Sequence, residues 1–211
     1  LAKYFSRRHV EIKRIKHLLV SALYVLVPVG FIMLQPDFGS AMVLMALWLG
    51  MALVAGISKR HIMIVGGVAI VAFAIAWFAL FKPYQKARIQ TFINPTADIR
   101  GSGYNAYQSV IAVGSGGLLG KGFGYGTQSR LNYLPEYETD FIFAAFAEEW
   151  GLVGALIIIA ALCVFLWRVL LHARRGASNF ETLFCAGYAI VIFSHVVVNV
   201  GMNIGIMPVT G

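Results

Sequence analysis

The chain has 211 residues, of which 59% are hydrophobic and 12% charged, and its mean hydropathy is +0.77. Soluble domains carry about 25% charged residues, so this composition excludes a soluble globular protein, and so much apolar surface also excludes a disordered one. The net charge of +8 would suit a nucleic-acid partner, but the placement of the charges argues against that class.

Five windows are long and apolar enough to cross a bilayer. In chain order they are 18–34, 40–57, 62–81, 150–171 and 182–207. We therefore predict an all-α fold, a polytopic transmembrane helix bundle that forms a single transmembrane domain over residues 1–211. The long segment 82–140 is predicted to be an extracellular loop. Trp48 lies in the middle of a window and does not fit the usual place of Trp at membrane interfaces.

The basic residues cluster in three places. Residues 1–17 hold six Lys/Arg against one Glu, 58–61 hold two, and 168–175 hold three. With five spans these places lie on one side, and short basic loops stay in the cytoplasm. The pattern predicts that 58–61 is inside and 82–140 outside. The pattern indicates that the positive charge sets the orientation of the protein in the membrane and attracts anionic membrane lipid. It does not indicate a nucleic-acid partner.

The outer segment is rich in glycine. Residues 101–126 contain nine glycines and Lys121, and 104–113 is typical of a short amphipathic helix or a re-entrant piece. Glycines beside Lys121 could cradle a phosphate through main-chain N–H groups. The alternative is a loop that needs positive φ at several positions.

Acidic residues stand at the ends of apolar windows, where they are costly unless paired, hydrated or useful. Asp140, at the outer start of the fourth span, is a candidate general base; the alternative is that Asp140 or its neighbour Thr139 caps a helix. Helical spacing makes Glu148 a better candidate than Glu149 for facing inward. Asp37, in the turn 35–39, either caps the next helix or faces a cleft.

The last window carries His195, Asn199 and Asn203 at a spacing of four residues, which places them in one stripe along a helix. We expect this stripe to form hydrogen bonds between helices. A path for substrate or protons is the alternative.

Several strings in the chain occur together in one known family. They are Gln35-Pro36-Asp37-Phe38-Gly39-Ser40, the glycine-rich 114–122 followed by Gly126-Thr127-Gln128-Ser129, and the block from Leu134-Pro135-Glu136 to Ala147-Glu148-Glu149. This ordered set resembles the SEDS family of bacterial cell-wall polymerases, and its RodA (elongation) branch more than its FtsW (division) branch.

The resemblance implies a fold of ten transmembrane helices, of which this chain, as a fragment, matches about the fifth to the ninth. It implies a multi-pass protein of the bacterial cytoplasmic (inner) membrane, with its active site facing outside. The implied enzyme is a peptidoglycan glycosyltransferase that polymerises undecaprenyl-linked lipid II during cell elongation and so controls rod cell shape. The implied partners are a class B penicillin-binding protein transpeptidase and the elongation complex. A divalent cation (Mg or Mn) and no organic cofactor are expected.

Carried over residue by residue, the resemblance makes Asp140 the catalytic residue. It also maps Asp37 onto a second aspartate of the family. The predicted substrate-binding residues are Asp37, Arg88, Lys121, Gln128, Ser129, Glu136 and Glu148. Positive charge for the leaving pyrophosphate could come from Arg88, from Lys121 or from a metal. The chain departs from many relatives at Tyr137-Glu138, which sets an extra negative charge beside Asp140. Two other functions stay open: a lipid II flippase, which would use polar residues through the full depth of the membrane, and a non-catalytic scaffold for a transpeptidase.

Overall fold

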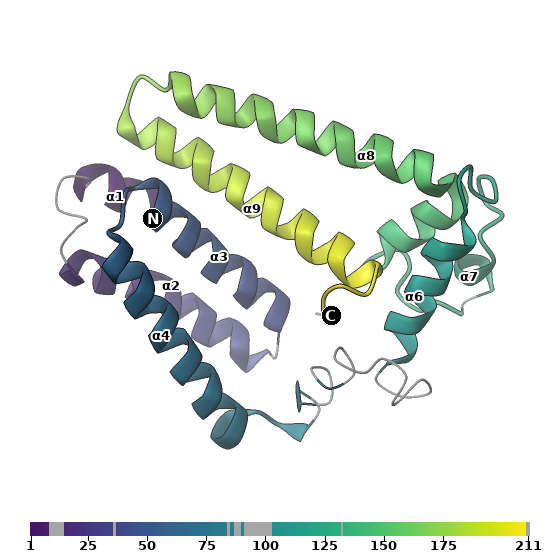
Figure 1. Cartoon of the computed structure of the whole chain (residues 1–211), viewed down its shortest axis with the longest axis horizontal. Coiled ribbons are helices and arrows are strands. Elements are labelled where there is room, and N and C mark those ends of the chain that lie inside the picture. Colours follow the sequence, from purple (N-terminus) through teal and green to yellow (C-terminus); the bar gives the residue numbers. More distant parts are fainter. Residues whose placement is uncertain are drawn as a thin grey trace. The chain divides into compact units, whose positions relative to one another are not determined.

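The computed structural model describes residues 1–8, 15–35, 37–83, 85–86, 90, 103–131 and 133–209, and every regular element in these ranges is a helix (Figure 1). In chain order the elements are α1 (Ala2–Arg8), α2 (Ile15–Leu34), α3 (Phe38–Val54), α4 (Lys59–Ile75), the π-helical turn η1 (Ala76–Leu80), α6 (Tyr104–Ser115), α7 (Thr127–Arg130), α8 (Ile142–Arg175) and α9 (Asn179–Asn203). The predicted all-α fold is confirmed.

Each predicted apolar window falls on a helix. Within the described residues, four helices are long and apolar enough to cross a membrane: α2, α4 with its π-helical end to Ala79, α8 and α9. Helix α3 is apolar but shorter, with 17 residues. The segment 82–140 is more structured than the predicted loop, because it contains α6 and α7. The helix expected at 104–113 is present as α6.

Helix α3 ends three residues before its predicted window does, because Gly56 stops it. Gly56 has a φ of +88°, its N–H donates to Leu53 O, and the N–H of Ile57 donates to Ala52 O. This pair of bonds is the Schellman motif, which uses a left-handed residue to satisfy the last helical carbonyls. Ser58 then begins α4 by accepting a hydrogen bond from the N–H of His61.

The chain divides into two compact units. Unit 1 comprises Leu1–Leu80 and Phe165–His195, and unit 2 comprises Phe81–Val164 and Val196–Gly211. That the chain forms a single domain stays a prediction.

Trp48 lies in the core of unit 1. Its ring is 5% exposed, and its indole N–H donates to the buried Ser21 hydroxyl at 3.1 Å. A buried Trp needs such a partner for its N–H. This pairing between α2 and α3 explains why Trp48 stands in mid-window and not at an interface.

The described parts of the three basic places gather at one end of unit 1. Phe5 of α1, Ile57 and Leu183 belong to one buried cluster, so α1, the α3–α4 turn and the start of α9 lie together. Val54, near the end of α3, lines the same cavity as Arg174, near the end of α8. The charge pattern therefore corresponds to a real grouping in space.

The short helix α6 contributes to the buried core of unit 2. Ala112 of α6 packs with Leu134, Phe141 and Ala144 in a buried cluster. Phe143 and Ala147 of α8 pack beside Val200 of α9 in a second cluster. This packing holds the segment that contains Asp140 between α6 and the end of α9.

Candidate functional site

Helix α8 is broken at Gly151. This residue has φ +66° and ψ −167°, which no helix accommodates. The break frees the N–H groups of Leu152 and Val153 and the carbonyls of Glu148 and Glu149 from their helical partners. Unpaired main-chain groups are expensive away from water, above all in a membrane, so another segment must satisfy them.

The glycine-rich loop 116–126 supplies those partners. Leu152 N donates to Gly117 O at 2.9 Å and Val153 N to Leu118 O at 3.1 Å. In return, Lys121 N donates to Glu148 O and Gly122 N to Glu149 O, both at 3.0 Å. The loop and the broken helix thus exchange main-chain hydrogen bonds in both directions.

Two glycines make this close approach sterically feasible. A Cβ at Gly120 would lie 2.0 Å from Glu149 O, and one at Gly151 would lie 2.3 Å from Gly120 N. Both residues also have positive φ. Because the N–H groups of Lys121 and Gly122 already donate to α8, they do not form the phosphate cradle considered from the sequence. The alternative, a loop with several positive-φ glycines, describes this loop.

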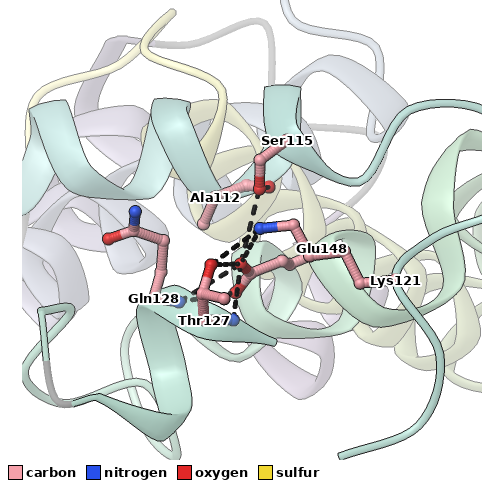
Figure 2. Close-up of polar contacts among 6 residues, drawn as sticks. All are labelled: Ala112, Ser115, Lys121, Thr127, Gln128 and Glu148. Carbon is pink, nitrogen blue, oxygen red and sulfur yellow. Dashed lines mark hydrogen bonds and ion pairs between the residues drawn. The ribbon is translucent and has the colours of Figure 1, made fainter. Parts of the chain in front are cut away.

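Glu148 is the centre of the polar contacts in this region (Figure 2). It is 0% exposed, and its Oε1 lies 2.7 Å from Lys121 Nζ in an ion pair. The main-chain N–H and the hydroxyl of Thr127 donate to the same oxygen at 2.9 and 3.0 Å, and Gln128 N lies 3.2 Å from both carboxylate oxygens. Ser115 Oγ lies 3.4 Å away. This one carboxylate therefore joins α6, the glycine loop, α7 and α8.

Glu149 behaves differently, as the helical spacing predicted. It is half-buried, and its Oε1 accepts one hydrogen bond, from Gly124 N at 3.1 Å. The inward position of Glu148 is confirmed. A substrate could reach the Glu148 carboxylate only by displacing one of its donors, so in this structure Glu148 positions Lys121 and the start of α7.

The main chain of Asp140 is fixed by two residues of α9. The side-chain amides of Asn199 and Asn203 each donate to Asp140 O at 3.2 Å. Asn203 is 0% exposed, and its Oδ1 accepts a hydrogen bond from Ala144 N at 2.9 Å. The expected interhelical hydrogen bonding is thus confirmed for Asn203, whose partner Ala144 lies in α8, while Asn199 bonds to the turn just before α8. His195, the third residue of the stripe, is exposed.

The cap alternative for Asp140 does not describe this helix start. Helix α8 begins at Ile142, and the N–H of Ala144 in its first turn is satisfied by Asn203. No described residue donates a hydrogen bond to the Asp140 carboxylate. The side chain is partly exposed, so it is available to a ligand while its backbone is held.

The turn before Asp140 contains an unusual conformation. Glu136 is the one described non-glycine residue with positive φ, at 57°, which costs about 1–2 kcal/mol. The Thr139 hydroxyl lies 3.0 Å from Glu136 Oε2, and the N–H groups of Thr139 and Phe141 donate to Glu136 O, both at 3.2 Å. Such strain concentrates at functional sites. Nearby, the bond from the Tyr137 hydroxyl to Glu138 raises the pKa of Tyr137.

Gln128 presents an unsatisfied acceptor. Its main-chain N–H donates to Glu148, but its side-chain Oε1 is buried without a donor from any described residue. A buried polar atom without a partner is costly, and it fits a residue that bonds to substrate. Ser129 lies beside it in α7.

The remaining predicted residues fall elsewhere. Asp37 belongs to unit 1 and caps α3, because its carboxylate accepts a hydrogen bond from Ser40 N at 3.0 Å. Hydrogen bonding with the Ser40 side chain and then its main chain lowers the pKa of Asp37 below 3.8. The helix-cap alternative is thus observed for Asp37, and a role at the substrate stays a prediction. Arg88 lies outside the described residues.

Sequence reasoning missed three members of this site. Thr127 and Ser115 bind Glu148, and Gly151 creates the break that the loop fills. Thr127 stood in a noted motif, but its partner lies 21 residues away. Glycine occurs in many transmembrane helices, so Gly151 alone did not signal a break.

The described residues do not form a complete metal site. No three of their His, Cys, Asp or Glu side chains come together as potential ligands. Mg²⁺ is often bound by one or two carboxylates together with substrate phosphates, and the Asp140 carboxylate fits that smaller role.

Comparison with known proteins identifies the class. All residues from 1 to 211 match one protein family, FtsW/RodA/SpoVE, described as "Cell cycle protein". The chain is 40% identical to the peptidoglycan glycosyltransferase MrdB of Escherichia coli K12 over 211 residues, 98% of this chain and 56% of that protein. It is 37% identical to the probable peptidoglycan glycosyltransferase FtsW of Nitrosococcus halophilus, over 100% of this chain and 54% of that protein.

A solved structure is also similar to this chain. A chain from a peptidoglycan synthase complex, studied for its coordination of polymerization and crosslinking, superposes with a TM-score of 0.78 at 28% identity, over 100% of this chain and 57% of that chain. The protein is therefore a multi-pass membrane protein. It belongs to the FtsW/RodA/SpoVE family of cell cycle proteins. The chain spans little more than half the length of these relatives.

Proposed function

We propose that the protein is a peptidoglycan glycosyltransferase that polymerises lipid II into glycan strands during cell elongation. The observation that carries the proposal is the way in which Asp140 is held. Its main chain is held by Asn199 and Asn203, while its carboxylate is left available to a ligand. The relatives named peptidoglycan glycosyltransferases, with the MrdB protein at 40% identity, support both the activity and the elongation branch.

The reaction joins two sugars. The 4-hydroxyl oxygen of one sugar attacks the anomeric carbon of another, a new C–O bond forms, and the bond from that carbon to the pyrophosphate oxygen breaks. The electron pair of the broken bond goes to that oxygen, and the pyrophosphate leaves still attached to its lipid carrier. Asp140 accepts the proton of the attacking hydroxyl as general base.

Charge on the leaving pyrophosphate requires a cation nearby. Lys121 is a candidate in unit 2, since its side chain is 28% exposed and is oriented by Glu148 and Thr127. Gln128, with its unsatisfied Oε1, is placed to accept a hydrogen bond from a sugar hydroxyl or amide. A divalent cation, when bound, would neutralise further phosphate charge, with Asp140 as its protein ligand.

The proposal includes an orientation and a partner. Segment 82–140 faces outside the cytoplasmic membrane, because the basic places gather at the opposite end of their helices. Cysteine labelling in intact cells tests this: an impermeant reagent should modify a cysteine at Tyr125 and spare one at Arg60. The synthase complex that contains the structural neighbour supports a class B penicillin-binding protein transpeptidase as partner.

Neither rival function accounts for these contacts. A flippase would use the polar stripe of α9 as a path, but Asn199 and Asn203 are occupied by Asp140 and Ala144. A scaffold for a transpeptidase would place no demand on the Asp140 carboxylate.

Asp140→Asn in the full-length protein tests the proposal. Asn keeps the shape and removes the negative charge, so the rate of lipid II polymerisation should fall by about 10²–10⁴-fold, measured as glycan ladders on gels at matched protein level and thermal stability. Glu138→Gln is the matched control, since it removes one neighbouring charge and leaves the base in place. Wild-type ladders from a stable Asp140→Asn protein would contradict the assignment.

A further inference from the structure

A cavity at the basic end of unit 1 has no part in the chemistry proposed above. Its volume is about 340 Å³, and it lies among the end of α3, the end of α8 and the start of α9. Small-ligand pockets range over about 300–1,000 Å³, so the cavity can take part of one ligand molecule.

The lining of this cavity is apolar with one charged exception. Six lining residues are apolar, among them Val54, Trp167 and Leu170, and the two polar ones are Arg174 and Thr182. Trp167 and Leu170 are 62% and 45% exposed, so the cavity opens at the protein surface. A lipid acyl chain can therefore enter it from the bilayer. An apolar wall with a single cation suits a ligand with a hydrocarbon part and an anionic group.

Charges around the cavity favour an anion. Arg168 and Arg175 are in the same helix as Arg174, and Lys59 begins α4 just after the α3–α4 turn. The nearby carboxylate of Glu181 accepts a hydrogen bond from Ala177 N at 2.9 Å, in the α8–α9 turn. Within the described residues, no carboxylate pairs with Arg174. Basic clusters at the end of membrane helices attract anionic lipids.

We propose that this cavity binds an anionic phospholipid, with one acyl chain against Trp167 and Leu170 and the headgroup phosphate at the Arg174 guanidinium. Guanidinium groups bind phosphate oxygens through two parallel hydrogen bonds, which suits Arg174, the charged residue of a lining that is otherwise apolar except for Thr182. The proposed occupant is a membrane lipid and not the substrate of the polymerisation, since neither Asp140 nor Lys121 lines this cavity.

The test is native mass spectrometry of the full-length protein in detergent, titrated with dioleoyl phosphatidylglycerol. Arg175→Gln is the matched control for Arg174→Gln, because it removes the same charge from the next residue, which does not line the cavity. Diffuse attraction to a basic surface weakens about fivefold per arginine lost in either variant. We expect Arg174→Gln to weaken lipid binding at least about tenfold more than Arg175→Gln.

Further arms separate the alternatives. Ala186→Phe fills the cavity without changing charge and should also weaken binding, with thermal stability as the check on folding. Dioleoyl phosphatidylcholine should bind more weakly, and glycerol phosphate, which has no chains, should not compete. Equal effects of Arg174→Gln and Arg175→Gln, equal binding of both lipids, competition by glycerol phosphate, or occupation of the cavity by a co-purified transmembrane helix would each overturn the proposal.

Discussion

Replacing Glu148 with Gln should weaken the attachment of the glycine loop to α8. The change keeps the shape of the side chain but removes the charge that faces Lys121 Nζ at 2.7 Å, and it exchanges one acceptor oxygen for a donor among the N–H and O–H groups of Thr127 and Gln128.

The size of the effect follows from burial. Removing one partner of a fully buried pair costs about 3–5 kcal/mol. Glu148 is 0% exposed, but Lys121 retains 28% of its side-chain exposure, and water can solvate its ammonium group. We therefore expect Glu148→Gln to lower the free energy of unfolding by about 2–3 kcal/mol, less than the full penalty for a buried pair.

Glu149→Gln is the control, because Glu149 accepts one hydrogen bond, from Gly124, and should cost about 1 kcal/mol or less. Thermal unfolding of the full-length protein in detergent compares the two variants. Adding Lys121→Met to Glu148→Gln should cost little more, since the pair is already broken. Equal melting temperatures for the two Gln variants, or additive losses for Lys121→Met, would refute this account of the ion pair.

Three further predictions concern other contacts. Gly120→Ala should destabilise the protein in thermal melts more than Gly117→Ala, because both residues have positive φ but the Cβ at Gly120 meets Glu149 O at 2.0 Å, while that at Gly117 meets open space. Asn203→Leu should reduce the polymerisation rate and lower the free energy of unfolding by about 2–3 kcal/mol. Asn199→Leu should have a smaller effect on both, since Asn203 still holds Asp140 O. Equal effects of the two variants would contradict this ranking. The pKa of Asp37 is lowered in the fold, so the stability from its cap should be present above about pH 4 and fade as the pH falls through the lowered pKa; melts of Asp37→Asn at pH 3–7 should lack this dependence.

Features that repeat locally along the chain were accessible from the sequence. The apolar windows predicted helices because a bilayer crossing needs a continuous apolar run, and the spacing of Asn199 and Asn203 placed both on one face. Those two asparagines bind a main-chain carbonyl, which has no signature in a sequence, so their partner Asp140 O could not be predicted.

The geometry of the loop was less accessible, because it depends on pairs distant in sequence. Nothing near Gly151 indicates that its neighbours bond to Gly117 and Leu118, more than thirty positions earlier. Glu148 could be predicted to face inward, but its role as the common acceptor for Lys121 and Thr127 required the folded loop.

The hydrogen bonds from α9 to Asp140 can form only late in the synthesis of the chain. Asn203 lies 63 residues after Asp140 and 59 after Ala144, and the ribosome makes the N-terminal part first. While α8 is being inserted, the turn that contains Asp140 has no anchor and the first turn of α8 has no cap. The main chain of Asp140 is fixed only after α9 has been synthesised and has entered the membrane. The main chain at Asp140 therefore lacks these two hydrogen bonds until α9 has been made.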